Sequence, residues 1–220
     1  MPNKSRNVAI IGLGTFGVSV ARELTRMGDN VLGIDDDPAR VSMICDEIKS
    51  SMQVDATDDK ALSQCALETY DAVLVSIGEN TEASILVAMN VVELGCRQVW
   101  VKAQTETQRK ILNAIGVHHV VLPEQRFGTH IAQIIHNPHV EDFMAFGDGQ
   151  YVVMMEVHSS LVGKLLSEFK FEKSHNISCM GVYADGVFSG PAYFSDALKK
   201  NDKIILFGTR SQLRKFSDSI

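Results

Sequence analysis

Long apolar runs are missing from this 220-residue chain. Crossing a bilayer takes about 20 consecutive apolar residues, whereas apolar stretches such as residues 72–75 have only the length of a β-strand. The opening residues 1–6 also lack the apolar core of a secretory signal and lead directly into a predicted strand. We therefore expect a cytoplasmic protein.

Closely spaced cysteines and an excess of positive charge are also missing. Zinc and redox sites need sulfurs that are near one another, and the four cysteines form no C-x-x-C pair, so we expect small buried thiols. The formal net charge is −6, whereas binding to nucleic acid needs a basic face that neutralises phosphates. No nucleic-acid partner is predicted. The cysteines are Cys45, Cys65, Cys96 and Cys179.

Short apolar strands alternate with amphipathic helices over the first 123 residues. This alternation is typical of a parallel sheet that helices cover on both faces, and right-handed crossovers then favour a doubly wound α/β (Rossmann) fold. The predicted strands are 8–11, 31–34, 51–54, 72–77, 98–102 and 117–122, and the predicted helices lie near 15–27, 38–49, 58–67, 80–94 and 105–115.

The segment that follows predicts a helix–turn–helix. Its apolar residues recur at helical spacing, an Asn-Pro pair at 137–138 interrupts them, and a second short helix resumes the pattern. The apolar stripe must be buried, either on its own domain or on another subunit. The residues concerned are Phe127, Ile131, Ile134 and Ile135, then Val140, Phe143 and Met144.

A small α+β lobe is predicted after residue 150. Strands are expected at 151–157, 177–183 and 203–207, with a short helix at 164–169 and a hairpin-type turn at 185–186. The predicted organisation is therefore a nucleotide-binding domain at 1–136, a crossover or linker at 137–150 and a C-terminal lobe at 151–220.

A G-x-G-x-x-G sequence follows the first predicted strand and opens the first predicted helix. In that context Gly12 permits a tight turn, Gly14 lets a pyrophosphate approach the backbone, and Gly17 lets helix and strand pack closely. The amides and positive end of the helix hold phosphate oxygens. The predicted ligand-binding turn comprises Gly12, Leu13, Gly14, Thr15, Phe16 and Gly17.

An acidic cluster ends the second predicted strand. Asp35 lies eighteen residues beyond Gly17, where a carboxylate accepts ribose hydroxyls. Asp36 and Asp37 add negative charge that repels a 2′-phosphate. The cluster therefore favours NAD-type or adenine nucleotides over NADP.

Other strand ends reach the same crevice in a doubly wound sheet. Asp55, Ala56 and Thr57 can border an adenine, and Ile77, Gly78 and Asn80 follow the fourth strand, although Asn80 is equally a helix N-cap. Lys102 is either a phosphate-binding cation or a solvated lysine, and Glu124 either a first-turn helix carboxylate or a ligand residue.

Several segments along the chain resemble those of a known protein family. They read VAIIGLGTFG at 8–17, VLGID at 31–35, DAT at 55–57, SIGENTEAS at 76–84, VWVKA at 99–103, IGV at 115–117, PE at 123–124, Gly128, Pro191 and NDKII at 201–205. The sequence resembles the RCK (TrkA/KTN) family of potassium-conductance regulators, most closely its Ktr-type members. The likeness covers nearly the whole chain, with an RCK-N domain followed by an RCK-C (TrkA-C) lobe.

The resemblance implies regulation rather than catalysis. It implies dimers that form through the crossover helix, an octameric ring, and docking on the inner face of the membrane against a potassium channel-like subunit of the KtrB or TrkH type. The implied ligand is ATP, ADP or NAD(H), with Glu124 near the phosphates and able to help hold a divalent or monovalent cation. Many Ktr members have arginine at the position of Thr15 in this chain. Threonine there removes a positive charge that would otherwise reach the terminal phosphate of ATP.

We therefore predict a nucleotide-gated regulatory subunit of potassium transport with no catalytic residues. A small NAD-dependent oxidoreductase is the alternative, although such an enzyme needs an acid–base group that the short C-terminal part does not supply in evident form. A nucleotide-binding interaction module without a potassium partner is the third possibility.

Overall fold

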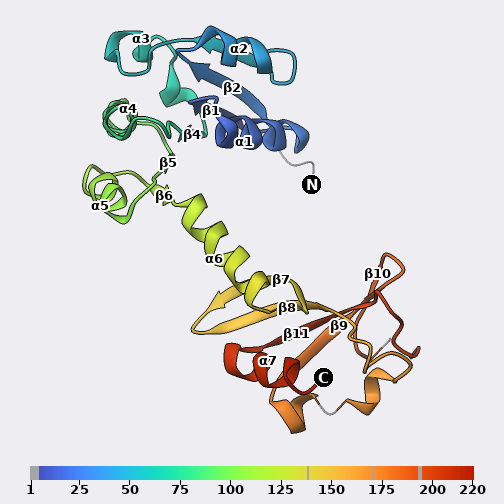
Figure 1. Cartoon of the computed structure of the whole chain (residues 1–220). Coiled ribbons are helices and arrows are strands. Elements are labelled where there is room, and N and C mark those ends of the chain that lie inside the picture. The colour runs from blue at the N-terminus through green and yellow to red at the C-terminus, as the bar shows by residue number, and fades with distance from the viewer. Residues whose placement is uncertain (1–4, 138, 170, 193–194) are drawn as a thin grey trace. The chain divides into compact units, whose positions relative to one another are not determined.

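The computed structural model describes residues 5–137, 139–169, 171–192 and 195–220 (Figure 1). Pro138, part of the predicted helix-interrupting pair, lies outside these residues. The chain divides into two compact units between residues 126 and 127, and each is described by itself. Across the described helices, none is both long and apolar enough to span a membrane.

The first unit contains a six-stranded parallel sheet. Its order is β3-β2-β1-β4-β5-β6, so the chain winds outward in one direction from β1 and in the other from β4 (Figure 1). This confirms the predicted doubly wound fold and places its switch point between β1 and β4. The strands are β1 (Asn7–Ile11), β2 (Asn30–Asp35), β3 (Ser50–Gln53), β4 (Ala72–Val75), β5 (Val99–Lys102) and β6 (His119–Val121).

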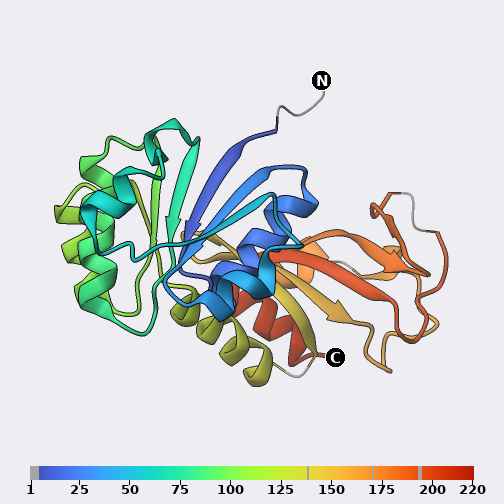
Figure 2. The ribbon, with the colours of Figure 1, turned by 90° about the horizontal axis from the view of Figure 1, so that it is seen from above.

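Helices cover both faces of this sheet. Because alternate strand residues face opposite sides, Val8 and Ile10 pack with α1 and α2, whereas Ala9 and Ile11 pack with α3, α4 and α5. Figure 2 shows the whole ribbon turned by 90° about the horizontal axis, with the first unit in blue to green. The helical segments are α1 (Thr15–Arg26), α2 (Pro38–Ile44), α3 (Asp59–Ser63), a 3-10 turn η1 (Leu67–Thr69), α4 (Thr81–Glu93) and α5 (Glu106–Ala114).

Helix α6 (Pro123–His136) begins in the first unit and continues into the second. It confirms the first helix of the predicted helix–turn–helix, but the second is wrong, because residues 140–147 form the strand β7 (Val140–Gly147). Irregularities in the pairing of β7 with β8 fall at Val140/Asp142 and Ala145/Gly147. Such bulges disturb the two-residue alternation of a strand, so the apolar spacing resembled that of a helix.

The second unit is an antiparallel sheet of order β10-β9-β11-β8-β7, with α7 packed against β11 and β8. Its hydrophobic core confirms the predicted α+β lobe. The short strand β10 and helix α7 were not predicted, and the helix expected at 164–169 is only the 3-10 turn η2 (Leu166–Glu168). The other elements are β8 (Gln150–Glu156), a π-helical turn η3 (Phe171–His175), β9 (Ser178–Ala184), β10 (Val187–Ser189), β11 (Lys203–Thr209) and α7 (Arg210–Ser217).

Candidate functional site

A cavity of about 780 Å³ opens at the carboxyl ends of the strands of the first unit. Its volume lies in the range of sites for small molecules and cofactors, and it extends to both sides of the switch point. All the predicted ligand residues except Leu13 and Gly17 line it. The lining comprises Ile11, Gly12, Gly14, Thr15, Phe16, Asp35, Asp36, Arg40, Val54, Asp55, Ala56, Thr57, Ser76, Ile77, Gly78, Glu79, Asn80, Ala83, Lys102, Gln104 and Glu124.

The floor of the cleft is the glycine-rich turn between β1 and α1. Gly12 has a φ of +94°, which side chains rarely adopt, and the hydroxyl of Ser76 donates a 2.6 Å hydrogen bond to its carbonyl oxygen. A Cβ atom on Gly17 would lie only 2.0 Å from that same oxygen. The turn can therefore close only with glycine at position 17, which explains why Gly17 shapes the cleft without lining it.

The N-terminal end of α1, the mouth of this helix, is open to the cleft. Gly14 is the N-cap residue and has no side chain to cap the helix, and a Cβ atom placed on it would meet nothing within 4 Å. The first-turn amides that follow, from Thr15 and Phe16, belong to the positive end of a twelve-residue helix. This is the arrangement that receives phosphate oxygens.

Asp35 is buried and holds the backbone around it. One carboxylate oxygen accepts from the Leu13 amide at 2.6 Å and the other from the Asp37 amide at 2.9 Å. Leu13 therefore contributes its amide to the carboxylate, while its side chain is buried in the core. Asp36 is exposed and lines the cleft. The two acidic residues thus differ: the Asp35 carboxylate fixes the turn, and the Asp36 carboxylate is exposed to the cleft.

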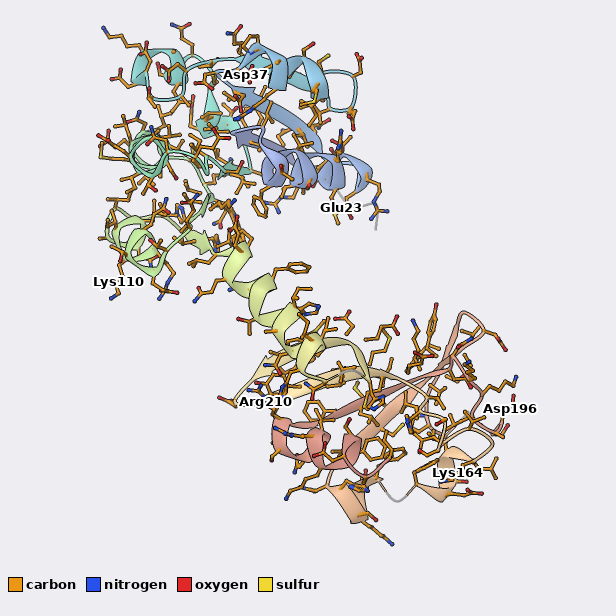
Figure 3. All side chains as sticks on the ribbon, viewed as in Figure 1. Glu23, Asp37, Lys110, Lys164, Asp196 and Arg210 are labelled. Atoms are coloured by element: carbon orange, nitrogen blue, oxygen red, sulfur yellow. The ribbon has the colours of Figure 1, made fainter. Side chains whose placement is uncertain are left out.

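Arg40 on α2 lines the cleft beside these carboxylates and was not among the predicted site residues. Its guanidinium donates to Glu79 at 2.9 Å and lies 3.8 Å from Asp35 and 3.7 Å from Asp37. Figure 3 labels Asp37, the N-cap of this helix. The pKa of Arg40 is raised above its ordinary value, chiefly by the charge of Asp35. Its place in the first turn of the helix after the acidic cluster is visible in the sequence, but its contact with Glu79, 39 residues away, is not.

The loop after β3 presents a fixed carboxylate. Asp55 accepts hydrogen bonds from the Thr57 amide at 2.9 Å and the Thr57 hydroxyl at 2.6 Å, and these bonds hold the pKa of its carboxyl below the usual value. Ala56 between them is buried and small, so it leaves room at the surface of the cleft. Residues 55–57, which were predicted to border an adenine, thus form a hydrogen-bonded turn at the cleft.

The loop after β4 forms the opposite wall. Asn80 is the N-cap of α4 and accepts from the Ala83 amide at 3.0 Å, which confirms the capping alternative for this residue while it also lines the cleft. The side-chain amide of Gln104, a residue that was not predicted, donates to the Gly78 carbonyl oxygen. This wall is therefore tied to the segment that follows β5.

Lys102 and Glu124 form a separate ion pair in the cleft, with Nζ and Oε1 2.5 Å apart. The lysine also lies 5.5 Å from the centre of the Phe16 ring. This lysine holds the pKa of the Glu124 carboxyl below its ordinary value. Glu124 lies in the first turn of α6, which confirms the helix-carboxylate alternative, and it also lines the cleft.

The predicted role of Glu124 in holding a cation finds no built metal site. Over the described ranges, no three histidine, cysteine or acidic side chains gather as metal ligands. The Glu124 carboxylate is instead paired with Lys102. These residues alone do not fit a metal ion.

Known proteins share both the sequence and the fold. The model of the TrkA-N domain family matches residues 8–123. The Ktr system potassium uptake protein A of Vibrio alginolyticus is 30% identical over 213 residues, which cover 97% of this chain and 97% of that protein.

Two solved structures share the fold at 17% identity. The crystal structure of the GsuK RCK domain has a TM-score of 0.67 and covers 99% of this chain, and the GsuK channel bound to NAD has a TM-score of 0.64 and covers 97%. This chain spans only 48% and 39% of the lengths of those two chains.

Proposed function

We propose that this chain, which belongs to the TrkA-N domain family, is a nucleotide-binding regulatory subunit of a potassium transport system. One observation carries the proposal: the open mouth of α1, the ribose-side carboxylates and the Asp55–Thr57 turn all line one cavity at the switch point. The relative from Vibrio alginolyticus, which matches over almost the full length of both chains, supports the link to potassium uptake.

The ligand that fits this cleft is an adenosine nucleotide. We place the ribose against Asp35 and Asp36, the adenine along residues 55–57 and the phosphates over residues 12–17. ADP, ATP and NAD(H) share this adenosine diphosphate portion, and a structure of similar fold was solved with NAD. A cation brought by the ligand would neutralise part of its charge. The Glu124 carboxylate, which lines the cleft, would help hold that cation if Lys102 pairs with a phosphate instead.

The exposed apolar side of α6 supports assembly of the subunit into dimers. None of the described residues of this helix is buried, and its exposed side chains include Phe127, Ile131 and Ile135. Apolar area of this kind is commonly covered by another subunit. We infer a dimer through α6 as the building block of an octameric ring.

Replacing Ile135 with glutamate is expected to weaken this dimer. Its side chain is 75% exposed in the single chain, so the charge costs little in the monomer but opposes burial in an interface. Sedimentation velocity should show at least a tenfold higher dissociation constant, because burying one large apolar side chain contributes about 1.5–3 kcal/mol. Met43→Glu on α2 serves as control, because the Met43 side chain is also apolar and 71% exposed and the charge changes by the same amount. Equal dissociation of the two variants, or no dissociation of Ile135→Glu, would exclude α6 as the interface.

The proposed partner is a membrane potassium channel-like subunit of the KtrB or TrkH type, reached from the cytoplasmic face. Exchange of one nucleotide for another would change the activity of this membrane subunit only if the nucleotides bind two conformations of the ring with different affinities. The test is potassium flux into vesicles that contain a Ktr-type membrane subunit. We expect flux to depend on this chain and to change when ADP replaces ATP or NADH.

Flux that is the same with and without the chain, under every nucleotide, would contradict the proposal. Substrate-dependent oxidation of NADH by the purified chain would instead favour the oxidoreductase alternative. The two outcomes are independent, so the flux assay and the oxidation assay together separate regulation from catalysis.

A further inference from the structure

Arg40 lines the cleft beside the acidic residues at the end of β2. Its guanidinium is 3.8 Å from the buried Asp35 carboxylate, at the end of β2 where dinucleotide-binding folds recognise the ribose. An arginine near this position is the usual means by which such folds accept the 2′-phosphate of NADP. The cleft therefore contains the cation for that ligand class, although its acidic cluster indicates the opposite preference.

Glu79 engages this cation from the far side of the cleft. It follows β4, whereas Arg40 follows β2, and β1 lies between these strands in the sheet. The Arg40–Glu79 hydrogen bond of 2.9 Å therefore joins the two walls above the glycine-rich turn. Asp35 and Asp37 also lie within 4 Å of the same guanidinium. Three carboxylates therefore surround one positive charge, and the net charge of this group is negative.

We propose that Glu79 determines ligand specificity by holding Arg40, so that the cleft accepts nucleotides with a free 2′-hydroxyl and rejects those with a 2′-phosphate. This inference rests on the proposed nucleotide-binding function. A ribose hydroxyl needs only a carboxylate acceptor and leaves the ion pair intact. A 2′-phosphate must displace Glu79 from Arg40 while it approaches Asp35 and Asp37, and like charges at such distances repel.

The test compares affinities for NADH and NADPH, measured by nucleotide fluorescence, in wild type and E79Q. Because the Glu79 side chain is 86% exposed, the substitution should leave folding unchanged. We expect the preference for NADH over NADPH to fall about five- to tenfold, the combined effect of a freed charge-assisted donor and one less repelling carboxylate. ADP and adenosine 2′,5′-bisphosphate form a second matched pair of probes.

Two further variants separate this mechanism from a general change in charge. E82Q removes an equal charge from an exposed residue in the first turn of α4 that is not among the residues lining the cleft, and it should retain the wild-type preference. The double variant E79Q/R40Q keeps the wild-type charge balance without a guanidinium, and it should also return to the wild-type preference.

The inference is overturned if E79Q keeps the wild-type ratio, or if E82Q or E79Q/R40Q shifts it as much as E79Q does. Failure of the wild-type chain to bind NADH, ADP or any other probe would instead contradict the proposed function on which the inference rests. The wild-type titration alone therefore distinguishes the two kinds of failure.

Discussion

Replacing Asp35 with alanine should lower the free energy of unfolding by about 2–3 kcal/mol and also abolish stabilisation by nucleotides. The carboxylate accepts from two backbone amides, those of Leu13 and Asp37. One hydrogen bond to a charged group contributes about 1.5–3 kcal/mol, and the buried Leu13 bond dominates because water can replace the part-buried bond from Asp37. Loss of the carboxylate leaves the buried Leu13 amide without an acceptor. Thermal unfolding should show a midpoint lowered by roughly 4–12 °C.

The matched control is Asp36→Ala. Asp36 is exposed, so this variant should unfold within about 0.5 kcal/mol of wild type. Its affinity for ADP or NADH should nevertheless fall roughly tenfold, because a charge-assisted hydrogen bond to the ribose is lost. Equal stability of both variants would show that Asp35 does not fix the turn. Unchanged affinity in both would remove these carboxylates from the site.

Replacing Gly17 with alanine should cost at least about 3 kcal/mol of stability, at the upper end of the cost of overpacking. The added Cβ atom would lie 2.0 Å from the Gly12 carbonyl oxygen and 2.6 Å from the Ser76 hydroxyl. Neither neighbour can simply rotate away, because the first is backbone and the second is bonded to it. Urea unfolding should show the loss directly, and nucleotide binding should disappear with the turn.

Gly14→Ala separates the packing role of this turn from phosphate binding. A Cβ atom there has nothing within 4 Å, so stability should change by no more than about 1 kcal/mol, the cost of alanine at an N-cap. Binding of ADP and NADH should still be lost, because the methyl group stands where the phosphate approaches the amides. A Gly14→Ala variant that binds normally would show that the phosphates lie elsewhere.

The first unit could be predicted from sequence because the local pattern of each segment agrees with the place of that segment in the fold. Apolar runs such as residues 72–75 are buried on both faces, and the glycine spacing has one steric explanation, seen in the contact that a side chain on Gly17 would make. All but two of the predicted ligand residues came to line one cavity, since parallel strands bring their carboxyl ends to a single edge.

The second unit was less predictable because its strands are irregular. Because β7 is bulged, its apolar residues do not alternate strictly, and Val140 and Phe143 have the three-residue spacing of a helix. Helix α7 is eight residues long, and only its capping box, from Thr209 to Gln212, marked its start.

Within the cleft, Arg40 and Ser76 escaped prediction for a different reason. Their roles depend on partners 39 and 64 residues away in the chain, Glu79 and Gly12 respectively. No local pattern reports contacts of that kind, because only the sheet order brings the partners together.

The measurement that tests the nucleotide site most directly is a crystal structure of the full chain with ADP. We expect the diphosphate within hydrogen-bonding distance of the amides of residues 14–16, and the ribose hydroxyls on Asp35 or Asp36. Density for ADP at another surface, with the cleft between β2 and β4 empty or filled by side chains, would contradict the proposed site.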